Sequence, residues 1–211
     1  MSALAGYPAA AEAAVGQLGS AEVAAAWGER SALEGMSVGA LAGHLAYQVL
    51  SVTEALEAAP SGGPPITLLE HYARAEWLGA PLDGDANSGI RAKGEGIAAE
   101  GPACLHERTR AALAEQRALL ADRTGDEVFF MPQTGWALHL DDFLATRLLE
   151  LAVHLDDLAV SVRLPTPELP ASAFDPVLVL LARLAARRHG QAALLRALAR
   201  VERASAPINA I

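Results

Sequence analysis

The stretch RLLELAVHLDDL, residues 147–158, decides the fold, because it combines the leucine spacing of a packed helix with a row of polar side chains. Its leucines recur every three or four residues, as on the buried face of a helix. Four polar residues keep the same spacing and therefore share one line: Arg147, Glu150, His154 and Asp157. This pattern predicts a core helix, within a longer helix at 141–163, that carries polar chemistry along one edge.

The apolar and polar stripes of this helix lie on neighbouring faces of a helical wheel. The apolar stripe comprises Leu144, Leu148, Leu151, Leu155, Leu158 and Val162. Glu150 and His154 are four residues apart at its edge, so a single metal ion can be reached by both. An ordinary contact on the helix surface is the alternative for such a pair.

A second histidine flanks an apolar stripe on another predicted helix, residues 38–59. The core positions of that helix are Leu41, Leu45, Val49, Val52 and Leu56. His44 and Gln48 lie to one side of this stripe. If the two helices pack with these flanks facing, His44 joins Glu150 and His154. Three protein ligands with an open fourth position are the layout of a catalytic zinc site.

The remaining sequence indicates an all-α protein. Hydrophobic residues make up 52% of the 211 residues but aromatic residues only 5%, which favours helices over sheets. Helices are predicted at about 8–30, 38–59, 67–78, 91–122 (regular only from Cys104), 141–163, 174–188 and 191–203. Residues 79–90 and 123–140 are expected to be loops. The longer helices predict a four-helix bundle over about 8–163, with two extra helices at 174–203, in a single domain.

Charge and cysteine content limit the classes of function. The formal net charge of −9 argues against a nucleic-acid partner, because phosphate binding needs clustered Lys and Arg. The one cysteine, Cys104, excludes a disulfide framework and is expected to be buried. The sequence has no apolar run of 18 residues, which predicts no membrane span, and no recognisable signal peptide. A cytoplasmic location is the default prediction.

These segments resemble the DinB-like superfamily, specifically the N-terminal domain of mycothiol-dependent maleylpyruvate isomerases. The resemblance runs through SVGALAGHLAYQV (37–49), IRAKGE and EGPACL (90–105), GWALHLDDFLATRLLELAVHLDDLAVSV (135–162) and LARLAARRHGQAALLRALARVERA (181–204). It implies a DinB-like four-helix bundle with a long crossover. It also implies a divalent metal, usually zinc with Ni²⁺ or Fe²⁺ as alternatives, held by His44, Glu150 and His154.

The resemblance implies a thiol-using enzyme of an actinobacterial cytoplasm, with mycothiol or a related thiol and a small-molecule substrate. A metal with an open position holds a thiol as thiolate, which is the nucleophile. Addition to an activated double bond, rotation and release of the thiol give cis–trans isomerisation, and a different second step gives S-transfer. The alternatives are a non-catalytic metal-binding bundle with a closed site and a hydrolase with metal-bound water.

Seven further residues receive subsidiary predictions. Arg147 is expected to bind a substrate carboxylate or to pair with a protein carboxylate as scaffold, and Arg91 is a candidate part of the pocket wall. Asp157 is expected to orient a ring nitrogen of a ligand histidine, with Gln48 as a second supporting residue. His139, which precedes the helix at 141–163, is a candidate proton relay or hydrolytic base. His71 and Trp77 are expected to serve ordinary packing.

Overall fold

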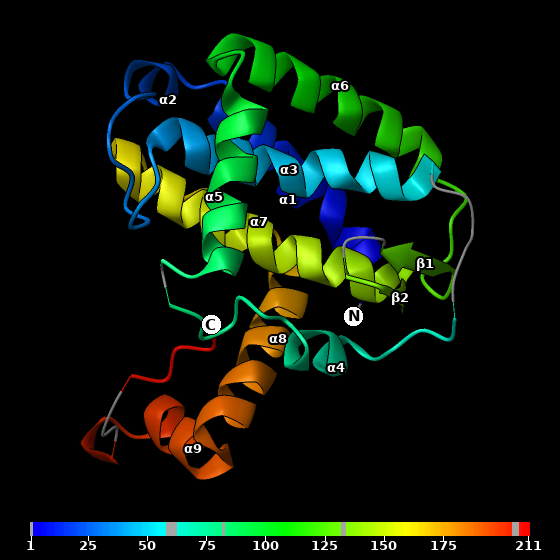
Figure 1. Ribbon diagram of the computed structural model, residues 1–211. Coiled ribbons are helices and arrows are strands. Elements are labelled where there is room, and N and C mark those ends of the chain that lie inside the picture. The colour runs from blue at the N-terminus through cyan, green and yellow to red at the C-terminus, as the bar shows by residue number, and fades with distance from the viewer. Residues whose placement is uncertain (1, 58–62, 82, 132–133, 204–206) are drawn as a thin grey trace.

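Figure 1 shows the computed structural model, which describes residues 2–57, 63–81, 83–131, 134–203 and 207–211. The chain is mostly helical. Its helices are α1 (Ala3–Leu18), α2 (Ala21–Ala25), α3 (Val38–Glu57), α4 (Leu68–Ala73), α5 (Asp85–Ala98), α6 (Pro102–Leu120), α7 (Leu140–Val162), α8 (Ala171–His189) and α9 (Gln191–Ala199). Two short strands, β1 (Val128–Met131) and β2 (Trp136–His139), precede α7. Across these described residues, no helix combines the length and apolarity that a membrane crossing requires.

Four helices form the predicted bundle: α1 packs on α7, α7 on α3, α3 on α6 and α6 on α1 (Figure 1). The leucines predicted to face the core of α7 are all buried, as is the apolar stripe of α3. The chain between α3 and α6 carries α4 and α5, which is the expected long crossover. The rotation of α3 and α7 about their axes was therefore predictable from apolar spacing alone.

Local sequence signals set several helix ends. The first helical segment is interrupted at Gly19, which ends α1. The hydroxyl of Ser37 accepts a hydrogen bond from the amide of Ala40 at 3.0 Å, as an N-cap should. Thr67 and Glu70 form a capping box at the start of α4. The predicted end of the second helix, residue 59, lies outside the described residues.

The loop predicted at 79–90 ends earlier than expected, at residue 84, and the irregular helix start predicted after it is wrong. A regular helix, α5, begins at Asp85 and crosses α3 (Figure 1). Its glycines permit close packing: a Cβ on Gly94 would lie 2.5 Å from the carbonyl oxygen of Ala40, and one on Gly43 would lie 2.1 Å from that of Gly94. Close packing of the two backbones therefore outweighs the low helix propensity of glycine.

Gly94→Ala is expected to destabilise the protein by about 1–3 kcal/mol, because the added methyl group overpacks the contact between α3 and α5. Gly96→Ala on the same helix is the matched control, since a Cβ there meets nothing within 4 Å. It should stabilise the protein by about 0.5–1 kcal/mol. Urea unfolding followed by circular dichroism measures both changes, and equal stability of the two variants would contradict the crossing described here.

Residues 123–140 were predicted to be a loop. They contain an antiparallel hairpin instead. Strand β1 pairs with β2 in the register Val128 to His139 and Met131 to Trp136. The amide of Ile66 donates to the carbonyl oxygen of Ala137 at 2.9 Å, so the segment before α4 joins the edge of β2. This contact holds α4 against the hairpin and beside α7.

The C-terminal helices follow the bundle in the predicted order. Helix α8 packs on α1 and α7, and α9 packs on α8 (Figure 1). Helix α8 begins at Ala171, slightly earlier than predicted, and α9 ends at Ala199. Cys104, expected to be buried, is exposed on α6, because the core-facing positions of that helix fall at Leu105, Thr109 and Leu113.

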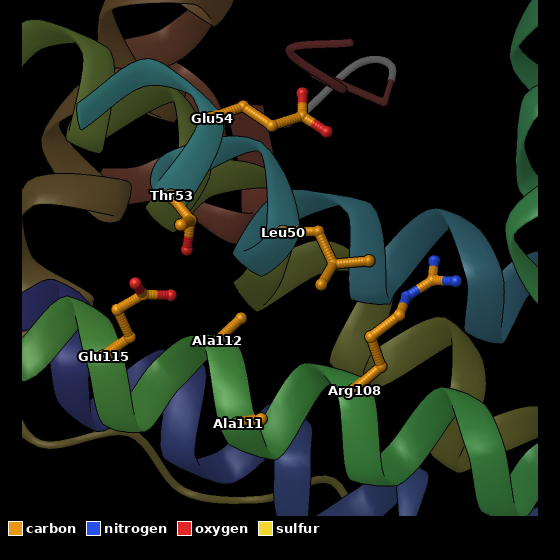
Figure 2. Close-up of a pocket in the computed structure, with 7 residues that line it drawn as sticks. All are labelled: Leu50, Thr53, Glu54, Arg108, Ala111, Ala112 and Glu115. Carbon is orange, nitrogen blue, oxygen red and sulfur yellow. The ribbon is translucent and has the colours of Figure 1, made fainter. Parts of the chain in front are cut away.

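A cavity of about 440 Å³ lies between α3 and α6 (Figure 2). Its lining consists of Leu50, Thr53, Glu54, Arg108, Ala111, Ala112 and Glu115. These side chains include two carboxylates and a guanidinium group but no imidazole or thiol. The metal-ligating chemistry predicted from the sequence belongs to a second and larger cavity, where α3, α4, α5, α7 and the hairpin meet.

Candidate metal centre

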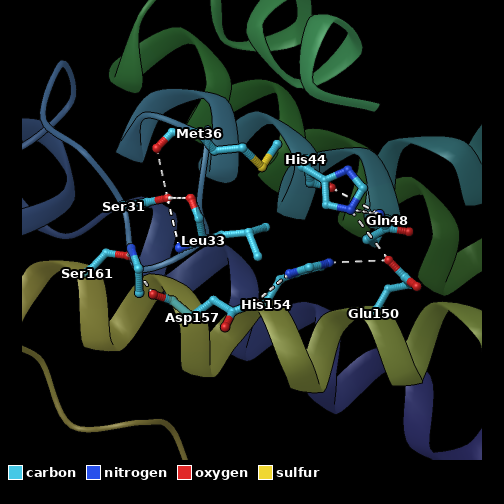
Figure 3. A network of polar contacts seen from close by, with 10 residues as sticks. Ser31, Leu33, Met36, His44, Gln48, Glu150, His154, Asp157 and Ser161 are labelled. Atoms are coloured by element: carbon cyan, nitrogen blue, oxygen red, sulfur yellow. Dashed lines mark hydrogen bonds and ion pairs between the residues drawn. The ribbon is translucent and has the colours of Figure 1, made fainter. Parts of the chain in front are cut away.

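Three side chains from two helices meet at the edge of the core: His44 on α3, and Glu150 and His154 on α7 (Figure 3). Oε2 of Glu150 lies 3.4 Å from Nε2 of His44 and 3.3 Å from Nε2 of His154. The two imidazole rings are edge to face, with centroids 4.6 Å apart. The flanks of the two apolar stripes therefore face each other.

The separations between these atoms fit a shared cation better than direct hydrogen bonds. An N–H···O hydrogen bond spans about 2.7–3.2 Å, which is shorter than both Glu–His distances. Ligand atoms placed 2.0–2.1 Å from a tetrahedral zinc ion lie roughly 3.3–3.4 Å from one another. Within the described part of the chain, no other group of three or more histidine, cysteine or carboxylate ligands lies this close together.

Asp157 contacts the far side of the His154 ring. Nδ1 of His154 donates to Oδ2 of Asp157 at 2.9 Å, which leaves Nε2 facing Glu150. One turn later, the hydroxyl of Ser161 donates to the carbonyl oxygen of Asp157 at 2.6 Å and accepts from the amide of Ala32 at 2.8 Å (Figure 3). A carboxylate behind a histidine in this way fixes its tautomer and its orientation toward a metal.

Gln48 is buried between His44 and Arg147. Its amide nitrogen donates to the carbonyl oxygen of His44 at 3.1 Å, and its amide oxygen accepts from Nη1 of Arg147 at 2.7 Å. The Arg147 guanidinium lies 5.5 Å from the centre of the Phe143 ring, and its Nε donates to the hydroxyl of Thr146 at 3.0 Å. Arg147 was predicted to pair with a protein carboxylate as one alternative. Its hydrogen bonds go instead to the amide of Gln48 and the hydroxyl of Thr146.

The electrostatics of the cluster favour ligand forms of its side chains. Burial opposes the charge of Glu150, but polar and electrostatic interactions with His154 and His44 outweigh it and hold the pKa of Glu150 well below its usual range. Burial lowers the pKa of His44. Burial acts the same way on His154, but Asp157 and Glu150 raise its pKa to about 9. A metal ion that binds here must therefore displace a proton from His154.

The cluster opens into a cavity of about 750 Å³. Aromatic side chains form much of its lining, namely Tyr47, His71, Trp77, Trp136 and Phe143. Cationic side chains line it too, including Arg74, Lys93 and Arg147. Nζ of Lys93 lies 3.5 Å from the centre of the Tyr47 ring. A cavity of this size, with a few polar groups among aromatic walls, is typical of a small-molecule site.

The structure does not bring every predicted residue to this cavity. His139 is the N-cap residue of α7, its Nδ1 lies 2.8 Å from the carbonyl oxygen of Asp126, and it is not part of the cavity lining. Arg91 donates to the hydroxyl of Ser88 at 2.8 Å and is likewise outside the lining. Both residues therefore lie outside the cavity lining, and their predicted roles stay predictions.

Some lining residues were missed or read as packing. His71 and Trp77 lie on the cavity wall rather than serving packing alone, and Lys93 and Trp136 join them there. Lys93 is the only lysine in the chain, a compositional signal that could have drawn attention to it. Trp136 has no such signal, because its position depends on a hairpin that the sequence did not predict.

The long-crossover bundle with its histidine–glutamate–histidine cluster defines a DinB-like fold. The chain belongs to the family of the mycothiol maleylpyruvate isomerase N-terminal domain, whose sequence profile matches residues 8–159. The crystal structure of the mycothiol-dependent maleylpyruvate isomerase is similar, with a TM-score of 0.54 and 18% sequence identity, over 87% of this chain and 68% of that chain. This likeness supports the fold. No curated protein matches the chain significantly.

Proposed function

We propose that the protein is a metal-dependent, thiol-using enzyme in which His44, Glu150 and His154 hold a divalent cation. Zinc fits this donor set best, with Ni²⁺ or Fe²⁺ as alternatives. The thiol is mycothiol or a related cytoplasmic thiol of an actinobacterium, and the second substrate is a small electrophile. The reaction is isomerisation or S-transfer, with the thiolate as nucleophile.

One observation carries this proposal: three ligand atoms within 4.8 Å of one another, with Glu150 3.3–3.4 Å from each histidine, lie on the wall of a cavity large enough for two small reactants. When bound, the cation supplies Lewis acidity that keeps a thiol deprotonated at neutral pH. Glu150 offsets part of the charge of the cation, and Asp157 holds His154 in its ligating tautomer.

Arg147 is proposed to bind the electrophile. Gln48 accepts a hydrogen bond from Nη1 of Arg147, and this contact fixes the direction of the guanidinium group on the cavity wall. A guanidinium held in this way can donate to a carboxylate or carbonyl oxygen. Aromatic side chains line the cavity beside this group, and a less polar surrounding strengthens such polar contacts.

Cobalt substitution tests the proposed thiol step. Adding mycothiol to the Co²⁺-loaded full chain is expected to produce a sulfur-to-cobalt charge-transfer band in the near ultraviolet. S-methyl mycothiol, which has no thiol to ionise, should produce none. A cobalt-loaded protein whose spectrum does not change at saturating mycothiol would contradict the proposal. Product analysis with maleylpyruvate then separates isomerisation from S-transfer.

The two alternative functions make different demands on the site. A closed, non-catalytic metal site calls for a fourth protein ligand, and the described residues contain a group of three. A hydrolase requires a general base beside the metal, and His139, the residue predicted for that role, is outside the cavity lining. The open cavity therefore supports the thiol enzyme over both alternatives.

We also propose that residues 1–211 form one domain. Helix α8 packs on α1 and α7 of the bundle, and the cavity includes Ile211 in its lining. Contact between the C-terminal segment and the cavity wall supports this division.

A further inference from the structure

His71 is held on the cavity wall by contacts that come from three parts of the chain. The capping box of Thr67 and Glu70 sets the start of α4. The hydrogen bond from Ile66 to Ala137 joins this segment to β2. As a result, the His71 ring lies 5.9 Å from the Trp136 ring, at 72° to it, with both side chains in the cavity lining.

Trp136 determines which nitrogen of His71 carries the proton. Nε1 of Trp136 donates to Nδ1 of His71 at 3.1 Å. An indole nitrogen only donates, so Nδ1 must be the unprotonated acceptor. The proton of the neutral ring then lies on Nε2. His71 is therefore a hydrogen-bond donor through Nε2, with its tautomer fixed by a neighbouring side chain.

His71 also remains uncharged at neutral pH. Burial, together with the nearby cation of Arg147, lowers the pKa of His71 to about 4. The ring is packed edge to face against Tyr72 at a centroid distance of 5.1 Å. A neutral imidazole held in one orientation donates a hydrogen bond without giving up its proton, which is the property of an electrophilic catalyst that polarises a carbonyl group.

We propose that His71 is a further catalytic residue, which donates its Nε2–H to a carbonyl oxygen of the electrophile in the cavity. This inference rests on the proposed function and narrows its second substrate to carbonyl-activated alkenes. Nothing in the sequence pattern of α4 assigns this role, because it depends on Trp136, 65 residues away.

The proposed step is addition of the thiolate to the electrophile. The thiolate sulfur forms a bond to the β-carbon of an α,β-unsaturated carbonyl compound, and the π pair of the alkene moves to give an enolate. The negative charge on the enolate oxygen is stabilised by the hydrogen bond from Nε2, and the proton stays on His71. In isomerisation, rotation is followed by return of the pair and loss of the thiolate. In S-transfer, a proton from water adds to the α-carbon.

Two electrophiles separate this role from simple packing. 2-Cyclohexenone develops charge on oxygen during thiol addition, whereas benzyl chloride releases chloride and does not. With zinc-loaded protein and mycothiol, His71→Phe is expected to lower kcat for cyclohexenone about 100-fold, and kcat for benzyl chloride by less than about threefold. His71→Gln, which keeps an N–H donor, should recover about tenfold of that loss.

Equal losses with both electrophiles would assign His71 to packing, and unchanged rates with both would remove it from the site. Zinc content and circular dichroism confirm that each variant is folded and loaded. A zinc-loaded wild-type protein that transfers mycothiol to neither electrophile and does not isomerise maleylpyruvate would contradict the proposed function itself, and with it this inference. An active enzyme with an unaffected His71→Phe variant would overturn the role of His71 alone.

The tautomer of His71 can be measured directly by NMR spectroscopy. Two-bond ¹⁵N–¹H correlation spectra of the zinc-loaded protein are expected to show His71 with a protonated Nε2 and an unprotonated Nδ1 from about pH 6 to 8. Trp136→Phe removes the donor to Nδ1 and should populate both tautomers, with a smaller loss of kcat for cyclohexenone than His71→Phe. A wild-type ring that is protonated at Nδ1 would overturn the proposal.

Discussion

His154→Ala is expected to leave the purified protein without bound metal while its helices stay folded. The substitution removes one of three protein ligands, and the affinity should fall by more than the roughly 100-fold that follows loss of an outer hydrogen-bonding partner. Alanine has a higher helix propensity than histidine, so α7 should persist. Metal analysis after gel filtration, with far-ultraviolet circular dichroism, measures both results.

A matched control is available at the start of the same helix. His139 bonds to the carbonyl group of Asp126 and is not part of the cavity lining, so His139→Ala should retain full metal content and activity. If His154→Ala kept one metal ion per chain, the cluster would be an ordinary polar contact. If His139→Ala lost activity but kept its metal, the result would support the sequence-based hypothesis that His139 is a hydrolytic base.

The convergence of the cluster was predictable because its determinants are local to two helices. Apolar spacing fixes which face of α3 and α7 enters the core, and the residues beside each stripe then follow from helix geometry. Glu150 and His154 needed only their four-residue spacing. His44 needed one further condition, that the two flanks face each other, and the 3.4 Å separation from Glu150 meets it.

The failures of sequence analysis arose where distant contacts override local preference. Glycines in the segment that forms α5 indicated a loop, since each costs helix stability of about 1 kcal/mol. The close approach of Gly94 to the backbone of α3 reverses that preference. The hairpin and the Trp136–His71 contact likewise join segments far apart in the chain, so helical periodicity carried no signal for them.

Asp157→Ala is expected to weaken metal binding about 10–100-fold without removing a ligand. Nδ1 of His154 donates to Oδ2 of Asp157 at 2.9 Å, and the carboxylate both orients the ring and makes Nε2 a stronger donor to the cation. Without it, the ring can rotate and populate the tautomer that has its proton on Nε2, which blocks ligation. Competition for zinc with a chelator dye of known affinity measures the loss.

Asp156→Ala is the matched control, because Asp156 is the adjacent residue on α7 but points away from the cluster to bond with the hydroxyl of Thr166. Its zinc affinity should stay within about twofold of the wild type, since an exposed charge on the opposite side of the helix is screened by solvent. If both variants lost the same zinc affinity, the cause would be the loss of a negative charge near the cation rather than the loss of a specific hydrogen bond. A loss confined to Asp157→Ala would require the specific hydrogen bond to His154, because only that contact orients the ring toward the proposed cation.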